Sequence, residues 1–183
     1  MKLLSGHEVD FDDISKLAVS YNDIETSLSR INRFNGHTPT GMIWSVAAHS
    51  VLVSMLCPTI ETKVWGLLHD AEEAYTCDLP KVLKNWVNDN SEGAYSRLQH
   101  SVSNEIIDTL VKDIRISDSD KQLVKLMDDL VNDVEYRYFM GEGVVENNFT
   151  LKDFFIKFDK TESYHCSEAR TRFRNLATLY KLI

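Results

Sequence analysis

The strongest constraint on this chain is the spacing of its apolar residues, which recur every three to four positions over most of its length. This is the period of an amphipathic α-helix, whereas a strand needs strict alternation. Only 7 glycines and 3 prolines interrupt the 183 residues, so long helices can form. The sequence therefore predicts an all-α protein with helices at 23–33, 41–56, 60–76, 79–87, 91–113, 118–140 and 162–181.

Length and composition indicate one domain. A chain of 183 residues with 43% hydrophobic residues can bury a single compact core. We expect the domain to cover 1–183, with its main core at about 23–140 and a loop and helix at 141–183. Ser91 and Ser117 precede two of the predicted helices and are expected to cap their free N–H groups.

Net charge and cysteine usage narrow the class of function. The formal charge of −8 argues against a nucleic-acid polymer as partner, because phosphate backbones are bound by excess lysine and arginine. Three cysteines without CxxC spacing indicate reduced thiols. The most apolar run, 41–57, contains a histidine and is shorter than the ~20 apolar residues of a membrane span. We therefore expect a cytoplasmic protein without membrane contact.

The segment "WGLLHDAEEAY" (65–75) places polar residues at the edge of a core-forming helix. On a helix through 60–76, His69 and Glu73 are four residues apart and Asp70 and Glu73 are three apart. Residues at these spacings project from adjacent turns toward a common point. The segment thus predicts a functional site that borders the core.

Two other predicted helices carry polar residues on apolar faces. His49 lies in "SVAAHSVLVSM", where a lone histidine is most often a core residue with one hydrogen bond. Asp128 and Glu135 share the apolar face of the helix at 118–140. A buried carboxylate costs several kcal/mol unless a cation, a donor network or a proton compensates it. A divalent ion is the simplest partner, and mixed imidazole and carboxylate ligands suit Zn, Co, Mn, Mg or Ni.

A histidine, a histidine–aspartate doublet in the next helix and a distant aspartate together resemble the signature of the HD-domain metal-dependent phosphohydrolases. The neighbouring segments agree: "DIETSLSRINRF", "RFNGHT", "WSVAAHS" and "LLHDAEEAYTCDLPKVLK". The likeness covers about 23–140 and is greatest to small bacterial 5′-deoxynucleotidases and phage dATP triphosphohydrolases. It implies a compact HD-domain helical bundle in a bacterial or phage-infected host cytosol.

The resemblance implies a role for each matching residue. The metal ligands would be His49, His69, Asp70 and Asp128. The catalytic residues would be Glu73, as general acid/base, and Asp78, in a supporting role. Substrate contacts are implied for Arg33, Phe34, His37, Pro80, Lys81 and Lys84.

Within the implied substrate site, Arg33 would hold phosphate, and Lys84 and Lys81 would neutralise further phosphate charge. Phe34 stands where relatives place a bulky aromatic ring, often tryptophan, against the sugar, which would exclude a ribose 2′-hydroxyl. Cys77 stands where relatives often carry glycine. We interpret Cys77 as a small buried filler and not as a catalytic thiol, because no histidine is placed by the sequence to activate it.

The implied reaction is metal-dependent hydrolysis of a deoxynucleotide at its 5′-phosphate. A dNTP, with dATP favoured, would give the deoxynucleoside and triphosphate. One alternative is a 5′-deoxynucleotidase that acts on dNMPs, and another is a non-catalytic nucleotide-binding module with a structural metal. The expected partner is a small deoxynucleotide. Because relatives are commonly oligomeric, a homo-oligomer is also expected.

Overall fold

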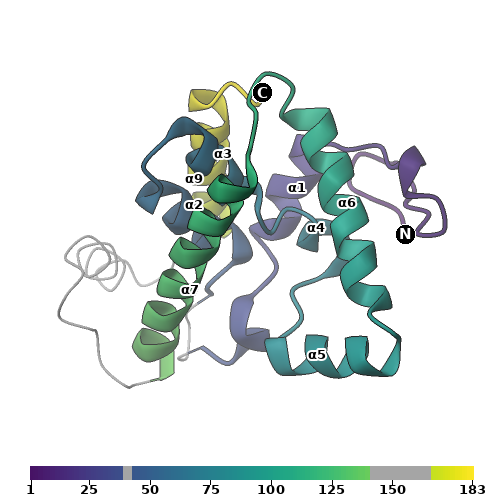
Figure 1. The fold of residues 1–183 in the computed structure, drawn as a ribbon, viewed down its shortest axis with the longest axis horizontal. Coiled ribbons are helices and arrows are strands. Elements are labelled where there is room, and N and C mark those ends of the chain that lie inside the picture. The colour runs from purple at the N-terminus through teal and green to yellow at the C-terminus, as the bar shows by residue number, and fades with distance from the viewer. Residues whose placement is uncertain (39–42, 141–165) are drawn as a thin grey trace.

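The protein is built from helices (Figure 1). The structure is a computed structural model, and it describes residues 1–38, 43–140 and 166–183. Across these residues there are two isolated β-bridges and no sheet, which confirms the all-α prediction. The expected loop at the start of 141–183 lies outside the described residues. The helices are η1 (Ile14–Lys16), α1 (Tyr21–Leu28), η2 (Arg33–Gly36), α2 (Val46–Leu56), α3 (Ile60–Leu68), α4 (Glu73–Thr76), α5 (Lys81–Asn90), α6 (Ala94–Leu110), α7 (Asp118–Met140) and α9 (Cys166–Leu179).

Helix α2 is the centre of the bundle. Every residue from Val46 to Ser54 is buried, and the helix packs against α3, α7 and α9. A helix that is apolar on all sides belongs in a core. Ser45 starts it by accepting a hydrogen bond from the N–H of Ala48. Position 49 is thereby carried into the interior, and His49 is 0% exposed.

Helix α3 approaches α2 closely at Gly66. A Cβ atom at this position would lie 3.1 Å from Cα of Ser54 and 3.2 Å from Sγ of Cys57. Both distances are shorter than ordinary van der Waals contact, so a larger residue would push the two helices apart. The glycine lets the end of α3, with the residues that follow it, lie beside α2.

The helix predicted at 60–76 is interrupted, so this prediction was wrong in its middle. Helix α3 ends at Leu68, residues 69–72 form a turn, and α4 begins at Glu73. The N–H of Ala71 donates to the Leu68 carbonyl and that of Glu73 to the Asp70 carbonyl. These i to i−3 bonds are tighter than those of an α-helix. The His69–Asp70 doublet therefore lies in a turn, where contacts with α2 and α7 decide its conformation.

The two predicted helix caps have different outcomes. Ser117 caps α7 as expected, because its hydroxyl accepts from the N–H of Asp120 while the Asp120 carboxylate accepts from the N–H of Ser117. The prediction for Ser91 was wrong. Helix α6 begins after Gly93, whose φ of 76° is in the left-handed region. The turn before α6 needs this positive φ, which glycine adopts without strain.

The C-terminal helix α9 belongs to the same core as the rest of the bundle (Figure 1). It packs on α1, α2 and α3, and Phe173 is fully buried. Leu179, by contrast, is 70% exposed, which leaves the end of the helix uncovered. Among the described residues, no helix combines the length and the apolar character needed to cross a membrane.

Candidate metal centre

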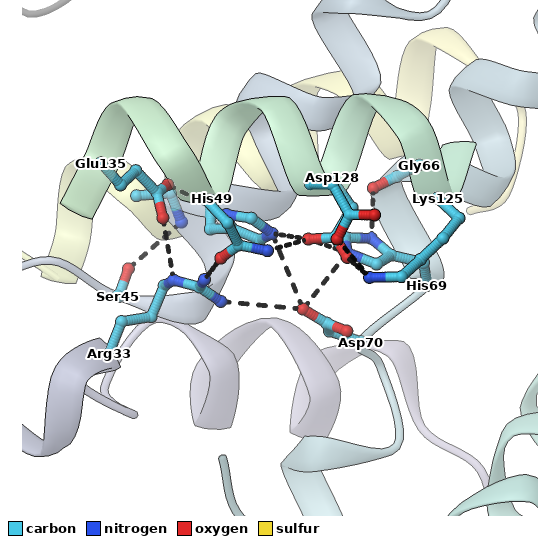
Figure 2. A network of polar contacts seen from close by, with 12 residues as sticks. Arg33, Ser45, His49, Gly66, His69, Asp70, Lys125, Asp128 and Glu135 are labelled. Atoms are coloured by element: carbon cyan, nitrogen blue, oxygen red, sulfur yellow. Dashed lines mark hydrogen bonds and ion pairs between the residues drawn. The ribbon is translucent and has the colours of Figure 1, made fainter. Parts of the chain in front are cut away.

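Four side chains from three parts of the chain meet in the interior (Figure 2): His49 of α2, His69 and Asp70 of the turn after α3, and Asp128 of α7. The Nε2 atom of His49 is 3.0 Å from Oδ1 of Asp128 and 3.8 Å from Oδ2 of Asp70. The Nε2 atom of His69 is 3.2 Å from Oδ2 of Asp70 and 3.8 Å from Oδ1 of Asp128. Both imidazoles thus turn the same nitrogen toward the two carboxylates.

The two shorter separations, 3.0 and 3.2 Å, match the edges of a metal coordination shell, and the two of 3.8 Å are slightly longer. Bonds of about 2.1 Å place neighbouring ligands about 3.0 Å apart in an octahedron and about 3.4 Å apart in a tetrahedron. The ligand atoms of His49, His69 and Asp70 lie within 4.8 Å of one another and could hold a metal ion. Asp128 stands outside that group of three, but its Oδ1 lies within 3.8 Å of both imidazoles.

The second nitrogen of each imidazole is already occupied. Nδ1 of His69 lies 2.9 Å from the Gly66 carbonyl oxygen, which can only accept, so Nδ1 carries the proton. Nδ1 of His49 lies 2.9 Å from Oε1 of Glu135. His49 and Arg33 lower the pKa of Glu135 against the opposing effect of its burial, so this carboxylate is charged and accepts. Such outer contacts orient metal-binding histidines and leave Nε2 as the ligand atom.

The two carboxylates of the centre favour a positive charge between them and the imidazoles. Nε2 of His69 is buried without a hydrogen-bond partner and faces two carboxylates. Burial opposes protonation of His69, but Asp70 and Asp128 outweigh it and raise its pKa well above the usual value. The histidines in turn lower the pKa of Asp70 and of Asp128 despite their burial. Either a proton or a metal cation between these groups would supply the positive charge that compensates the two carboxylates.

Three further side chains brace the ligand candidates. Arg33 donates from Nε to Oε2 of Glu135 at 3.1 Å and also hydrogen-bonds Asn132. Asn132 donates to Oδ1 of Asp128 at 2.6 Å, and Nζ of Lys125 lies 2.9 Å from Oδ2 of the same residue. Sequence reasoning placed Glu135 on the correct face but expected a metal as its simplest partner, whereas Arg33 and His49 compensate it. It missed Asn132 and Lys125. Their spacing from Asp128, one helical turn in either direction, is the signal that could have found them.

Three carboxyl groups next to the centre, those of Glu72, Glu73 and Asp78, have raised pKa values. Glu73 is 8% exposed, and its Oε2 has no hydrogen-bond partner within the described chain. Burial, together with the charges of Asp70 and Asp78, raises its pKa well above the usual value. Burial and Asp70 raise the pKa of the adjacent Glu72 to about 8, and burial raises that of Asp78. Glu73 is therefore a group that can take up or release a proton close to the four ligand candidates.

The predicted substrate residues divide into two sets. Arg33 lies at the centre, with its guanidinium 5.7 Å from the centroid of the Phe34 ring, which itself lies 5.9 Å from the ring of Phe139. His37, Pro80 and Lys81 are exposed, and within the described residues no contact joins them to the four ligand candidates. The structure therefore brings only part of the predicted set to the centre.

Lys84 lies in a cavity that His69 also lines. The cavity has a volume of about 300 Å³, and its wall also includes Glu72, Trp65 and Lys121. A lysine that sequence reasoning did not single out, Lys121, thus shares this cavity with Lys84. The cavity provides positive charge beside the imidazole of His69.

Cys77 is exposed, so the prediction of a buried filler was wrong. Its φ of 68° and ψ of 156° fall in a region that only glycine adopts readily. The chain needs this conformation to end α4 and to turn Asp78 back toward Arg33, whose charge acts on the Asp78 carboxyl. Glycine would meet the same requirement without strain.

Comparison with known proteins finds relatives but no described family. No family model matches the chain. It is 40% identical over 102 residues to the uncharacterized protein YfdR of Escherichia coli, an alignment that covers 56% of this chain and 53% of that protein. It is 33% identical over 84 residues to an uncharacterized protein of Rhodobacter capsulatus, covering 43% of each. The chain spans about half the length of the curated relatives it matches, and the printed names of both relatives state no activity.

Proposed function

We propose that the protein is a metal-dependent phosphohydrolase of the HD-domain type that acts on the 5′-phosphate of deoxynucleotides. The observation that carries the proposal is the paired orientation of the two imidazoles. Glu135 and the Gly66 carbonyl hold the Nδ1 atoms, so both Nε2 atoms face Asp70 and Asp128. A divalent ion such as Zn, Co, Mn or Mg would fit this donor set.

A bound divalent ion would polarise the phosphoryl group and lower the pKa of water. The protein's own residues would do the rest. Oε2 of Glu73, which is buried without a partner, would accept the proton of the attacking water. A bond would form between water oxygen and the phosphorus next to O5′, and the bond from that phosphorus to O5′ would break. Glu73 would then pass the proton to the leaving O5′, which gives the deoxynucleoside. Arg33 would stabilise the negative charge that spreads over the phosphoryl oxygens.

The cavity beside His69 favours a triphosphate substrate. Lys84 and Lys121 both line it together with His69, and Arg33 does not line it. A triphosphate carries more negative charge than a monophosphate and needs additional cations along its length. The proposed reaction is therefore conversion of a dNTP, with dATP favoured through the family resemblance, to deoxynucleoside and triphosphate. A 5′-deoxynucleotidase that acts on dNMPs is the alternative.

The test is a product assay with purified protein and each dNTP and dNMP, in which triphosphate is separated from orthophosphate by chromatography. We expect deoxynucleoside and triphosphate from a dNTP. Orthophosphate from dNMPs alone would show the alternative to be correct. Absence of turnover with every deoxynucleotide, in the presence of each of the four metals, would leave a binding module and refute the enzymatic proposal.

Two variants connect the assay to the residues. Glu73→Gln should lower turnover by about 100-fold or more, as expected for a general base, while elemental analysis finds the bound metal unchanged. Asp128→Asn should lose metal as well as activity. Asp133→Asn is the matched control, because Asp133 lies on the same helix and is half exposed, with Arg137 as its partner. Equal metal content in the Asp128 and Asp133 variants would contradict the assignment of Asp128 as a ligand.

A further inference from the structure

A second cavity, of about 420 Å³, lies between the end of α1 and helix α9. It shares no residue with the metal centre or with the cavity beside His69. The protein as a whole has a formal charge of −8, yet the residues of the described chain that line this cavity include three arginines and no carboxylate. Its lining residues are Ser29, Arg30, Cys166, Ser167, Arg170, Thr171 and Arg174.

Two of the arginines are held in place by one buried acid. Glu25 of α1 is 0% exposed, and its Oε1 accepts from Nε of Arg170 at 2.9 Å. Its Oε2 accepts from Nε of Arg174 at 2.8 Å, and a second nitrogen of Arg174 donates to Oε1. Arg170 is further fixed by its hydrogen bond to Asn22. Both guanidiniums are therefore preorganised at the cavity wall.

The Glu25 cluster, which consists of Glu25 with the three arginines of the cavity, carries more positive charge than is needed to neutralise the Glu25 carboxylate. One arginine would neutralise this carboxylate, and the second contributes a net charge of +1. Arg30 adds another, because its guanidinium makes no hydrogen bond or ion pair with any residue that the structure describes. The hydroxyls of Ser29 and Thr171 already donate to the Thr26 and Ser167 carbonyls. The arginines are thus the main donors that remain for a ligand.

We infer that this cavity binds the phosphate group of a small phosphorylated molecule, at a site separate from the proposed catalytic centre. Guanidinium groups form bidentate, charge-assisted hydrogen bonds with phosphate oxygens. Three arginines around one concave surface, with two held by a buried acid, provide such donors at a low cost of ordering. The volume lies in the range of small-molecule sites.

The test is isothermal titration of the full-length protein with inorganic phosphate, pyrophosphate and ATP. Arg30→Ala should weaken binding of the tightest of these probes by about tenfold, the effect of removing one charge-assisted contact. Arg30→Glu should weaken it further. The matched control is Arg172→Ala, because Arg172 lies on α9, pairs with Glu168 and does not line the cavity. Its affinity should stay within about twofold of wild type.

A third variant separates this site from the catalytic proposal. Asp70→Asn removes a proposed metal ligand and should leave the Arg30-dependent binding unchanged. Binding that disappears in Asp70→Asn but persists in Arg30→Glu would place the phosphate at the metal centre and overturn the inference. Absence of binding for all three probes in the wild-type protein would overturn it as well.

Discussion

Glu25 and Glu135 are both fully buried carboxylates. Basic side chains are in excess around Glu25, whereas acidic side chains are in excess around Glu135. Glu25 lies among an excess of cations, with Arg170 and Arg174 bonded to it. Glu135 lies in a region with an excess of acids. The acids of that region are Asp70, Glu72, Glu73, Asp78, Asp128 and Glu135, and in the described chain their directly paired lysine and arginine partners are Arg33 and Lys125.

The difference indicates what each region is suited to bind. Buried charge is tolerated only when it is compensated, so an unbalanced cluster destabilises the fold unless a ligand completes it. The candidate metal centre can accept a cation, whereas the Glu25 cluster can accept an anion. Substitutions of acids in the two regions should therefore change stability in opposite directions.

The largest effect is expected at Glu25. Glu25→Ala removes the shared partner of two arginines and leaves a void between α1 and α9, so the free energy of unfolding should fall by about 3 kcal/mol. Chemical denaturation measures this change. The control is Glu168→Ala, which breaks only the exposed pair with Arg172 and should change stability by less than about 0.5 kcal/mol. Similar losses in the two variants would mean that burial of Glu25 contributes nothing.

The opposite sign is expected at Glu72. Burial and Asp70 raise its pKa from 4.5 to about 8, so the folded metal-free protein retains a proton that the unfolded chain releases. Its contribution to stability is therefore lost as the pH rises from 4.5 toward 8. At pH 7, which is 2.5 units above 4.5, this penalty is about 3 kcal/mol. Glu72→Gln removes it but leaves a buried amide in its place, so the metal-free protein should be more stable by about 2 kcal/mol.

Thermal unfolding at several pH values tests this second expectation. The difference in Tm between Glu72→Gln and wild type should grow as the pH increases over that range. Glu105→Gln on α6 provides the control, because the Glu105 carboxylate forms no hydrogen bond or ion pair with the residues that the structure describes. A variant that is less stable than wild type at pH 7 would show that the ionised Glu72 is compensated after all.

The smallest effect is expected at Cys77, whose backbone is in a conformation that is strained for any residue other than glycine. Cys77→Gly should raise the free energy of unfolding by about 1 kcal/mol, because glycine adopts φ near 68° without a clash. Cys77→Ala retains the Cβ atom and should give no gain. Denaturation curves of the two variants decide the matter, and equal stability would refute backbone strain at this turn.

Some of the fold could be predicted from the sequence because local rules govern it. The apolar run around His49 predicts a buried helix, and Ser117 with Asp120 forms a capping box that depends only on neighbouring residues. Prediction failed where tertiary contacts override helix periodicity. His69 and Asp70 continue the helical pattern in sequence, but they end α3 in a turn whose side chains contact α2 and α7.

The candidate site divides in the same way. The complete set of four ligand candidates rests on the family resemblance. From residue type and spacing alone, the polar edge at His69 and Asp70 and the carboxylate of Asp128 could be identified, since a carboxylate on an apolar face needs a compensating partner wherever the helices lie. The roles of Glu135, Asn132 and Lys125 could not, because each depends on which atom of a distant residue it meets. Arg33 and Asn132, for example, are 99 positions apart in the chain.

By itself, the sequence determined the helical class, the burial of α2 and the identity of the polar residues that the core must accommodate. These follow from periodicity and from the cost of burying charge, which are properties of short segments. Only the tertiary structure decided which imidazole nitrogen faces the carboxylates, and that Glu25 is joined by arginines 145 and 149 positions away. Such choices depend on packing between distant segments, and no local pattern encodes the distance between two side chains on different helices.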